Sequence, residues 1–219
     1  MRIPTVLFVV FALAMAAFGQ AIAGAPSDAF QVRYAANLNV GGSVITAANS
    51  GTQNVDGSVI NITNAGTQNT EGGVLSNICA NVYAFSPDEQ LISCCSCTVT
   101  PNALVSLSAV SDLISNTLTP ARPNSIVVKL IATAGTTCDP SNVPVANLAS
   151  GMVAWGTTIH AVPTTPGAYT VTETAFAQPG LSAAELARLT SFCGFIQANG
   201  SGFGICRSCR LGGQGAVKQ

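Results

Sequence analysis

The cysteines constrain the fold of this chain more than any other feature. All eight follow residue 78, and three of them fall within residues 93–97. Because an N-terminal export signal precedes them, we expect them to be oxidised to disulfides rather than kept as reactive thiols. The sequence therefore predicts four disulfides, formed by Cys79, Cys94, Cys95, Cys97, Cys138, Cys193, Cys206 and Cys209.

A zinc site is the alternative use of these cysteines. Cys94, Cys95 and Cys97 together with Cys206 and Cys209 contain enough thiolates for tetrahedral coordination. Neighbouring residues of an extended strand point to opposite faces, however, which suits Cys94 and Cys95 poorly to one metal ion. The same alternation predicts that the cluster ties two different structural layers, with Cys94 on one face of its strand and the other two cysteines on the opposite face.

The partners of the cysteines are less constrained than their oxidation. We expect Cys79 to join one member of the cluster across a hairpin, and Cys138, in the loop at residues 135–140, to take another. Cys193 is then expected to pair with Cys206 or Cys209 after the glycine-rich turn at residues 199–204.

Residues 1–23 have the pattern of a secretory signal peptide. Arg2 is followed by an uncharged apolar run at residues 6–18 and by Ala21-Ile22-Ala23, which places cleavage before Gly24. A membrane anchor, the alternative, needs about 20 apolar residues. We therefore expect a secreted, extracellular or cell-surface protein, or a periplasmic one, with no membrane span after signal cleavage.

The charge content argues against several classes of partner. Only 8% of the residues are charged, against about 25% in average soluble proteins. Loss of Arg2 with the signal leaves seven basic residues (8 − 1) against nine acidic ones, a net charge of −2. Such a balance exerts no attraction on nucleic acid or anionic membranes. It also leaves identical copies of the protein with little mutual repulsion.

A tandem repeat occupies residues 42–71. Copies 42–56 and 57–71 are identical at nine of fifteen positions, and each contains a Val-Ile pair followed by an Asn-x-Gly turn. Two copies are too few for a solenoid. We expect a hairpin or β-arcs at the edge of the main domain. The alternative is an exposed β segment that pairs with another copy of the protein.

The remaining sequence has the pattern of an antiparallel β protein. We divide the chain into the signal (1–23), an N-terminal β extension (24–75) and a cysteine-rich domain (76–219). Strands are predicted at 30–34, 79–85, 90–98, 104–110, 125–132, 152–162 and 168–174. Turn signals at 86–89 and 163–167 join four of them into two hairpins. Several short strands separated by turns favour a mainly β fold, a disulfide-stapled antiparallel β-sandwich.

One helix is predicted, over residues 182–198, packed on the sandwich. Ser182 and Glu185 form a capping box, in which each side chain bonds the other residue's backbone amide. Four apolar residues then recur at helical spacing on the buried face, namely Leu186, Leu189, Cys193 and Ile196. Cys193 on that face predicts a covalent link between the helix and the sheet.

No residue is predicted to be catalytic, and we expect no enzymatic activity, no cofactor and no metal. His160 is the single histidine and lies in an alternating strand pattern, where a structural role is expected. A Gly-x-Ser-x-Gly elbow is missing from the sequence. Cys206-x-x-Cys209 follows a helix instead of opening one, which disfavours redox catalysis. Asp88 and Glu89 occupy a turn, where carboxylates are ordinarily solvated.

The sequence thus favours a secreted or cell-surface structural or adhesive protein. Its copies would associate through the repeated β segment. Two alternatives remain open. One is a monomeric extracellular binding module, lectin-like or recognising a protein partner, with its site in the loops around Trp155 and Tyr169. The other is a secreted enzyme of unfamiliar type.

Overall fold

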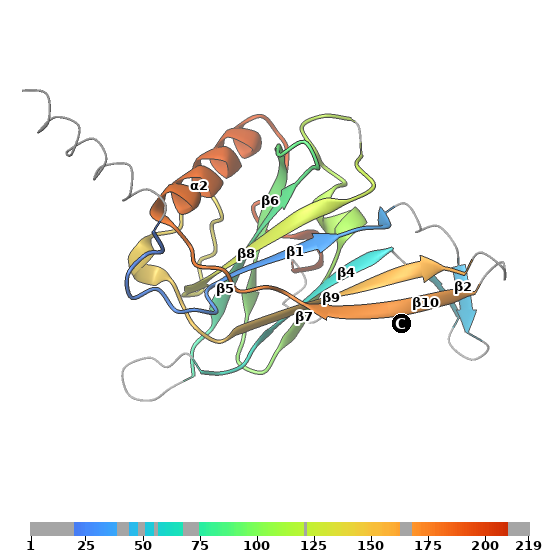
Figure 1. The fold of residues 1–219 in the computed structure, drawn as a ribbon, viewed down its shortest axis with the longest axis horizontal. Coiled ribbons are helices and arrows are strands. Elements are labelled where there is room, and N and C mark those ends of the chain that lie inside the picture. The colour runs from blue at the N-terminus through green and yellow to red at the C-terminus, as the bar shows by residue number, and fades with distance from the viewer. Residues whose placement is uncertain are drawn as a thin grey trace, which may run out of the picture.

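The computed structural model describes residues 20–38, 44–47, 51–54, 57–67, 75–120, 122–162 and 168–209. Two four-stranded antiparallel sheets pack face to face, and one long helix lies against the outer face of the first sheet (Figure 1). The predicted fold class, a disulfide-stapled antiparallel β-sandwich with a C-terminal helix, is confirmed.

Each sheet has a simple strand order. The first sheet runs β1 (Phe30–Ala35), β8 (Ile126–Ala134), β5 (Ile78–Phe85), β6 (Leu91–Val99). The second runs β10 (Tyr169–Ala175), β9 (Met152–Ala161), β4 (Ser58–Asn64), β7 (Leu104–Ser108). A separate hairpin joins β2 (Val44–Ala47) to β3 (Gly51–Asn54), and short helical turns occur at η3 (Ala109–Leu113), η4 (Val145–Asn147) and η5 (Arg207–Cys209).

The main core lies between the two sheets. Ile60 and Ile62 of β4 meet Val82 of β5 and Leu130 of β8 there, and all four side chains are fully buried. Every residue of β5 is buried, because the second sheet covers one of its faces and the helix layer covers the other. Burial on both faces explains why β5 reads as a continuous apolar run rather than a strict alternation.

Residues 24–75, expected to form an extension, supply one strand to each sheet. β1 pairs with β8, and β4 lies between β9 and β7. The two repeat copies differ in structure, since the first contains the β2–β3 hairpin and the second contains β4. Two large apolar residues, Ile60 and Ile62, follow a period of two in the second copy, whereas the first copy has Ile45 and Ala47 at those positions. Only the second copy can therefore fill an inward-facing sheet position twice.

The predicted Asn-x-Gly turn is present at the end of β4. The amide N–H of Gly66 donates to Asn64 Oδ1 at 2.9 Å, and the Asn64 amide group donates to the carbonyls of Ser76 and Val99. Asn64 thus closes the turn and fastens it to the first sheet. The remaining repeat residues, at 42–43, 48–50, 55–56 and 68–71, lie outside the described residues.

Strand β7 ends earlier than predicted. The strand was expected to continue to residue 110, but the chain turns into η3 after Ser108. The Ser108 hydroxyl accepts the amide of Ser111 at 3.0 Å, and Asp112 Oδ2 accepts the amide of Ser108 at 2.9 Å. These side-chain bonds replace the ladder that a longer strand would have made.

Helix α2 (Ala183–Ala198) matches the predicted bounds and buried face. Leu186, Leu189, Cys193 and Ile196 are buried against the outer face of the first sheet, as predicted. The Ser182 hydroxyl accepts the amide of Glu185 at 3.1 Å. The other half of the capping box is not formed, because the Glu185 carboxylate pairs with Lys129 of β8 and Arg188 of α2 instead.

All eight cysteines form disulfides, but their pairing differs from the expected one. The bonds are Cys79–Cys138, Cys94–Cys193, Cys95–Cys206 and Cys97–Cys209. As predicted, the cluster ties two layers, since Cys94 points to α2 and the other two point into the core between the sheets.

The expected partner of Cys79 was wrong for a reason of register. In the β5–β6 ladder Cys79 lies opposite Thr98 rather than opposite a cysteine. Cys193 misses Cys206 and Cys209 because α2 covers the outer face of β6, whereas those two cysteines lie on its inner side.

Most of the predicted signal peptide, residues 1–19, lies outside the described residues. Near its end, the amide of Ile22 donates to the carbonyl of Leu181 at 2.7 Å, and Ile22 packs on the α2 layer. Within the described part of the chain, we find no helix whose length and apolarity would allow it to cross a membrane.

Candidate functional site

A β-sandwich can pair with other chains at its edge strands. In this protein, other segments of the chain cover some of these edge strands and not others. The four edge strands are β1, β6, β7 and β10. Along β6, the segment 203–206 forms backbone bonds to Cys94 and Ser96, at 2.9 to 3.1 Å. Two disulfides fix the adjoining residues, Cys206 and Cys209, to the same strand. The β6 edge is therefore occupied by the protein's own chain.

The edges of β1 and β7 are also protected. Val32 of β1 exchanges two backbone hydrogen bonds with Ala177, at 2.8 and 2.9 Å. β7 is short and turns directly into η3, where the fully buried Asp112 accepts the amide and the hydroxyl of Ser208, at 2.7 and 2.8 Å. Short edge strands and covering segments are the usual means of blocking unwanted pairing.

Strand β10 has no such cover among the described residues. Two bonds bracket its ladder with β9, from Val162 N–H to the Ala168 carbonyl and from Phe176 N–H to the Ala154 carbonyl, each 3.0 Å. Backbone groups alternate in an antiparallel ladder, so the even-numbered residues of β10 bond to β9. The odd-numbered residues direct their N–H and C=O groups away from the sheet; these are Tyr169, Val171, Glu173 and Ala175.

The composition of β10 also favours pairing. The strand, YTVTETA, is made of β-branched, aromatic and small residues and has Glu173 as its single charge. It contains none of the prolines, lysines or bulges that commonly block a sheet edge. Val171 is 58% exposed, and residues 170–175 are all exposed. The next outward-facing residue along the chain is Ala177. Its backbone groups are already bonded to Val32 of β1, so the uncovered edge ends at Ala175.

A buried arginine holds β9 and β10 to the first sheet. Arg33 of β1 is 8% exposed; its Nε donates to Thr174 Oγ1 at 2.8 Å and its Nη2 to Thr158 Oγ1 at 2.9 Å. The guanidinium lies against the backbone of Gly156, where a Cβ would come within 2.0 Å of Nη1. Burial lowers the pKa of Arg33 from its ordinary value. The group thus positions β10 without forming an ion pair among the described residues.

His160 lies in the same polar layer. Its Nδ1 is 2.9 Å from Asn37 Nδ2, and its Nε2 is 2.9 Å from Thr172 Oγ1. Because an amide nitrogen only donates, Nδ1 is the acceptor and a neutral ring carries its proton on Nε2, which donates to Thr172. Both ring nitrogens are thus engaged by an amide and a hydroxyl, with no carboxylate of the described residues bonded to them. This arrangement supports a structural role.

The other residues considered from sequence are not brought together into one site. Trp155 and Tyr169 lie at opposite ends of the β9–β10 ladder, opposite Ala175 and Ala161 respectively. The two aromatic residues, in whose loops the alternative binding module was expected to have its site, are therefore separated by the length of the ladder. Asp88 accepts a hydrogen bond from Ser86 within its turn, and both residues are exposed or nearly so.

The thiol chemistry considered from sequence also has a clear structural answer. The sulfur atoms of Cys97, Cys206 and Cys209 lie within 4.8 Å of one another. Each is already bonded in a disulfide, so none is a thiolate that could bind zinc. Cys206 and Cys209 belong to two different disulfides rather than to one redox pair.

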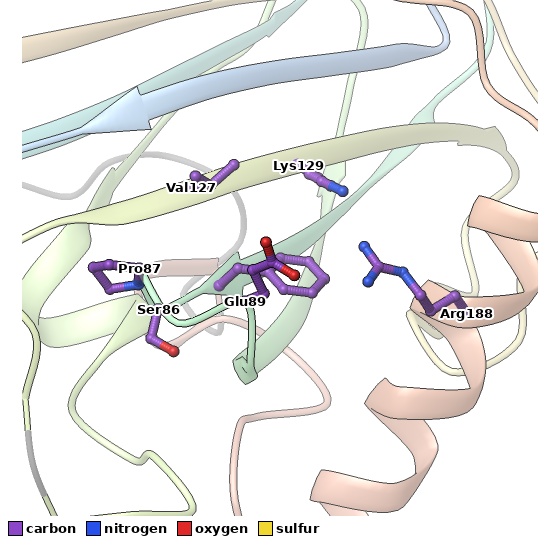
Figure 2. Close-up of a pocket in the computed structure, with 7 residues that line it drawn as sticks. Ser86, Pro87, Glu89, Val127, Lys129 and Arg188 are labelled. Atoms are coloured by element: carbon purple, nitrogen blue, oxygen red, sulfur yellow. The ribbon is translucent and has the colours of Figure 1, made fainter.

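One pocket was not anticipated from the sequence. It has a volume of about 470 Å³ and lies between the turn at residues 86–89, β8 and α2. Figure 2 shows Lys129 and Arg188 directed toward each other from β8 and α2, with Glu89 beside them. The two cations lie over the ring of Phe85, at 4.9 and 5.3 Å from its centre. The residues come from three elements far apart in sequence, which is why no local motif predicts them.

The charges of this pocket are largely neutralised inside the protein. Glu185 pairs with Lys129 and, at 3.1 Å, with Arg188. Burial by itself raises the pKa of Glu185, but hydrogen bonds and charge from Lys129 and Arg188 outweigh it and hold that pKa below its usual value. A single carboxylate thus serves both cations, and the cluster joins α2 to β8.

Comparison of the chain with family models, with curated protein sequences and with solved structures gives no match. A β protein with four disulfides is typical of extracellular surroundings.

Proposed function

We propose that the protein is an extracellular structural protein whose copies associate with one another through sheet edges. The observation that carries the proposal is the difference between β10 and the other three edge strands. Three edges are covered or short, whereas β10 leaves its outward backbone groups unpaired among the described residues. An uncovered strand edge of this kind is a template for pairing with another strand.

The surface chemistry supports association of identical copies. The predicted mature chain has a net charge of about −2, and few charged side chains of either sign. Electrostatic repulsion between copies is therefore weak. Four disulfides keep the body rigid, so that strand pairing does not require the sandwich to rearrange.

The structure favours self-association over the two alternative functions. The aromatic residues expected to form a binding site are separated along the β9–β10 ladder, and the charged pocket pairs its own cations. His160 is held by an amide and a hydroxyl rather than by a carboxylate. A binding module or an enzyme needs polar groups that converge on one site, and these residues are dispersed over the molecule.

The arm exchange expected from the repeat would carry a larger cost than pairing at β10. Donating the second copy to a neighbour would withdraw β4 from between β9 and β7. Ile60 and Ile62, fully buried in the core, would lose their positions there. β10 can pair without removing any strand from its own sheet.

The test is to export the full chain, sequence its N-terminus and measure its mass by sedimentation over a wide concentration range. We expect the mature chain to begin at Gly24, to contain no free thiol and to associate reversibly as its concentration rises. A strictly monomeric protein at the highest attainable concentration would contradict the proposed function. Reduced cysteines in the native product would contradict the extracellular location.

A further inference from the structure

We infer that two copies join through their β10 strands, antiparallel, with Val171 of one copy opposite Glu173 of the other. This inference rests on the proposed function and specifies the surface that performs it. The joined strands would convert two four-stranded sheets into one continuous sheet.

Hydrogen bonding restricts the register to a small set. Only odd-numbered residues of β10 direct their backbone groups outward, so outward residues of one copy must face outward residues of the other. Pairing Tyr169 with Ala175 and Val171 with Glu173 engages all four outward residues of both copies. A register centred on Val171 leaves Ala175 without a partner from β10, and one centred on Glu173 leaves Tyr169 without one.

Charge independently disfavours one of the two alternative registers. Centring the contact on Glu173 would place the two carboxylates directly opposite each other, which is unfavourable in a strand pair. In the inferred register each Glu173 lies opposite Val171, whose side chain is 58% exposed in the single copy. The Glu173 carboxylate also accepts the Thr157 hydroxyl at 3.1 Å within its own sheet, so it already has a polar partner there.

Closure follows from the number of open edges. Antiparallel pairing of one strand with its own copy is symmetric, and each molecule uses the same surface once. β1, β6 and β7 are covered or short, so the described strands of the two four-stranded sheets offer no second open edge for further growth. The predicted product is a closed dimer with Thr172 of each copy on the two-fold axis.

The first experiment introduces charge opposite Glu173. Val171→Lys places a cation opposite the carboxylate of the second copy, and Val171→Glu places an anion there. We expect Val171→Lys to lower the dimer dissociation constant several-fold, in a manner weakened by salt, and Val171→Glu to raise it several-fold. The same two substitutions at Val153, an exposed valine of β9 beyond the end of β10, should leave the dimer dissociation constant unchanged.

The second experiment traps the two-fold axis. Thr172→Cys should form an intermolecular disulfide under mild oxidation, because the two residues form a non-hydrogen-bonded pair about 4.5 Å apart between their Cα atoms. Thr170→Cys is the control, since residue 170 would face residue 174 of the second copy. Circular dichroism and free-thiol titration establish that each variant folds with its native disulfides.

The outcomes separate the inference from the proposed function. A wild-type protein that never associates overturns both. A wild-type protein that associates, but whose association is insensitive to both Val171 substitutions and shows equal cross-linking at residues 170 and 172, overturns the β10 dimer alone. If both Val171→Lys and Val171→Glu weakened the dimer, the register would likewise be overturned. Repulsion by either charge would indicate that residue 171 lies opposite residue 171 of the second copy.

Discussion

A single side chain, Arg33, links β9 and β10 to the first sheet. Its guanidinium reaches from the first sheet to two threonines of the second and lies flat on Gly156. A charged group in this position needs hydrogen-bond acceptors from β9 and β10 and free space on the side facing the backbone of β9. Thr158 and Thr174 supply the former, and the missing side chain of Gly156 supplies the latter.

Gly156→Ala tests this arrangement. The new methyl would lie 2.0 Å from Arg33 Nη1 and displace the guanidinium from its two hydroxyl acceptors. We expect a loss of about 1–3 kcal/mol in the free energy of unfolding, measured by urea denaturation. In a protein that already carries Arg33→Ala, Gly156→Ala should lower the free energy of unfolding much less. Gly204→Ala, which meets no atom within 4 Å, is the control; equal losses with and without Arg33 would contradict the argument.

Glu185 predicts a pH dependence with a definite sign. Its pKa is lower in the folded protein than in the unfolded chain, because Lys129 and Arg188 stabilise the ionised carboxylate. Such a group contributes stability above its unfolded pKa and loses the contribution as the pH falls through its folded pKa. We expect Glu185→Gln to flatten the acid side of the curve of unfolding free energy against pH. If Glu185→Gln left the low-pH part of this curve unchanged, the prediction would be contradicted. Glu89→Gln, which removes a carboxylate from the neighbouring turn, is the control.

At the scale of the element, strand β6 organises the molecule. It carries three cysteines, of which one binds α2 on the outer face and two bind the C-terminal segment on the inner face. The segment at 203–206 then lies along the β6 edge and pairs with it. The two kinds of disulfide thus have different consequences, since only the inner pair keeps an edge covered.

Removing the inner disulfides should change how the protein assembles. Replacing Cys95, Cys97, Cys206 and Cys209 by alanine frees the segment over β6 and exposes a second edge. We expect species larger than a dimer in sedimentation experiments. Replacing Cys94 and Cys193 instead should lower stability by roughly 2–4 kcal/mol and loosen α2 without opening an edge. If both variants assembled alike, the β6 edge would have no part in limiting growth.

The elements themselves were largely readable from sequence. Strand alternation, the turn at 86–89 and the helix stripe predicted β5, β6, β9, β10 and α2 within one or two residues, because each pattern is set by local geometry. Pairing was not readable. Cys79 meets Cys138 rather than the cluster because the β5–β6 register places it opposite Thr98, and register depends on the whole sheet.

The candidate site shows the same division. That 168–174 is a strand follows from its residues, but that it is an uncovered edge depends on where 177 and 203–206 pair. One local signal did bear on the site. A glycine inside a strand pattern indicates close approach of another group, and Gly156 is where Arg33 lies. The pocket at Lys129 and Arg188 had no such signal, since it arises only where α2, β8 and the turn at residues 86–89 pack together.

For the whole molecule, the question is which part of the chain the sandwich can lose. The end of β1 and the start of β4 lie close to each other, beside Ile159 of β9. Asn37 Nδ2 donates to the carbonyl of Ile159, and the backbone amide of Ile159 donates to the carbonyl of Gly57. The described residues before and after the first repeat copy, Asn37 and Gly57, therefore lie beside the same residue of β9.

The two repeat copies, equal in length and similar in sequence, give a matched pair of deletions. Removing 57–71 takes away β4 and leaves β7 and β9 without their shared partner, so we expect an unfolded or insoluble product. Removing 42–56 leaves all strands of both four-stranded sheets in the chain, and Asn37 and Gly57, on either side of the deletion, both bond to Ile159. The second variant should fold, retain four disulfides and associate like the wild type, as measured by circular dichroism, thiol titration and sedimentation. Loss of association with the fold preserved would move the contact from β10 to the first repeat copy, because that is the sole segment removed.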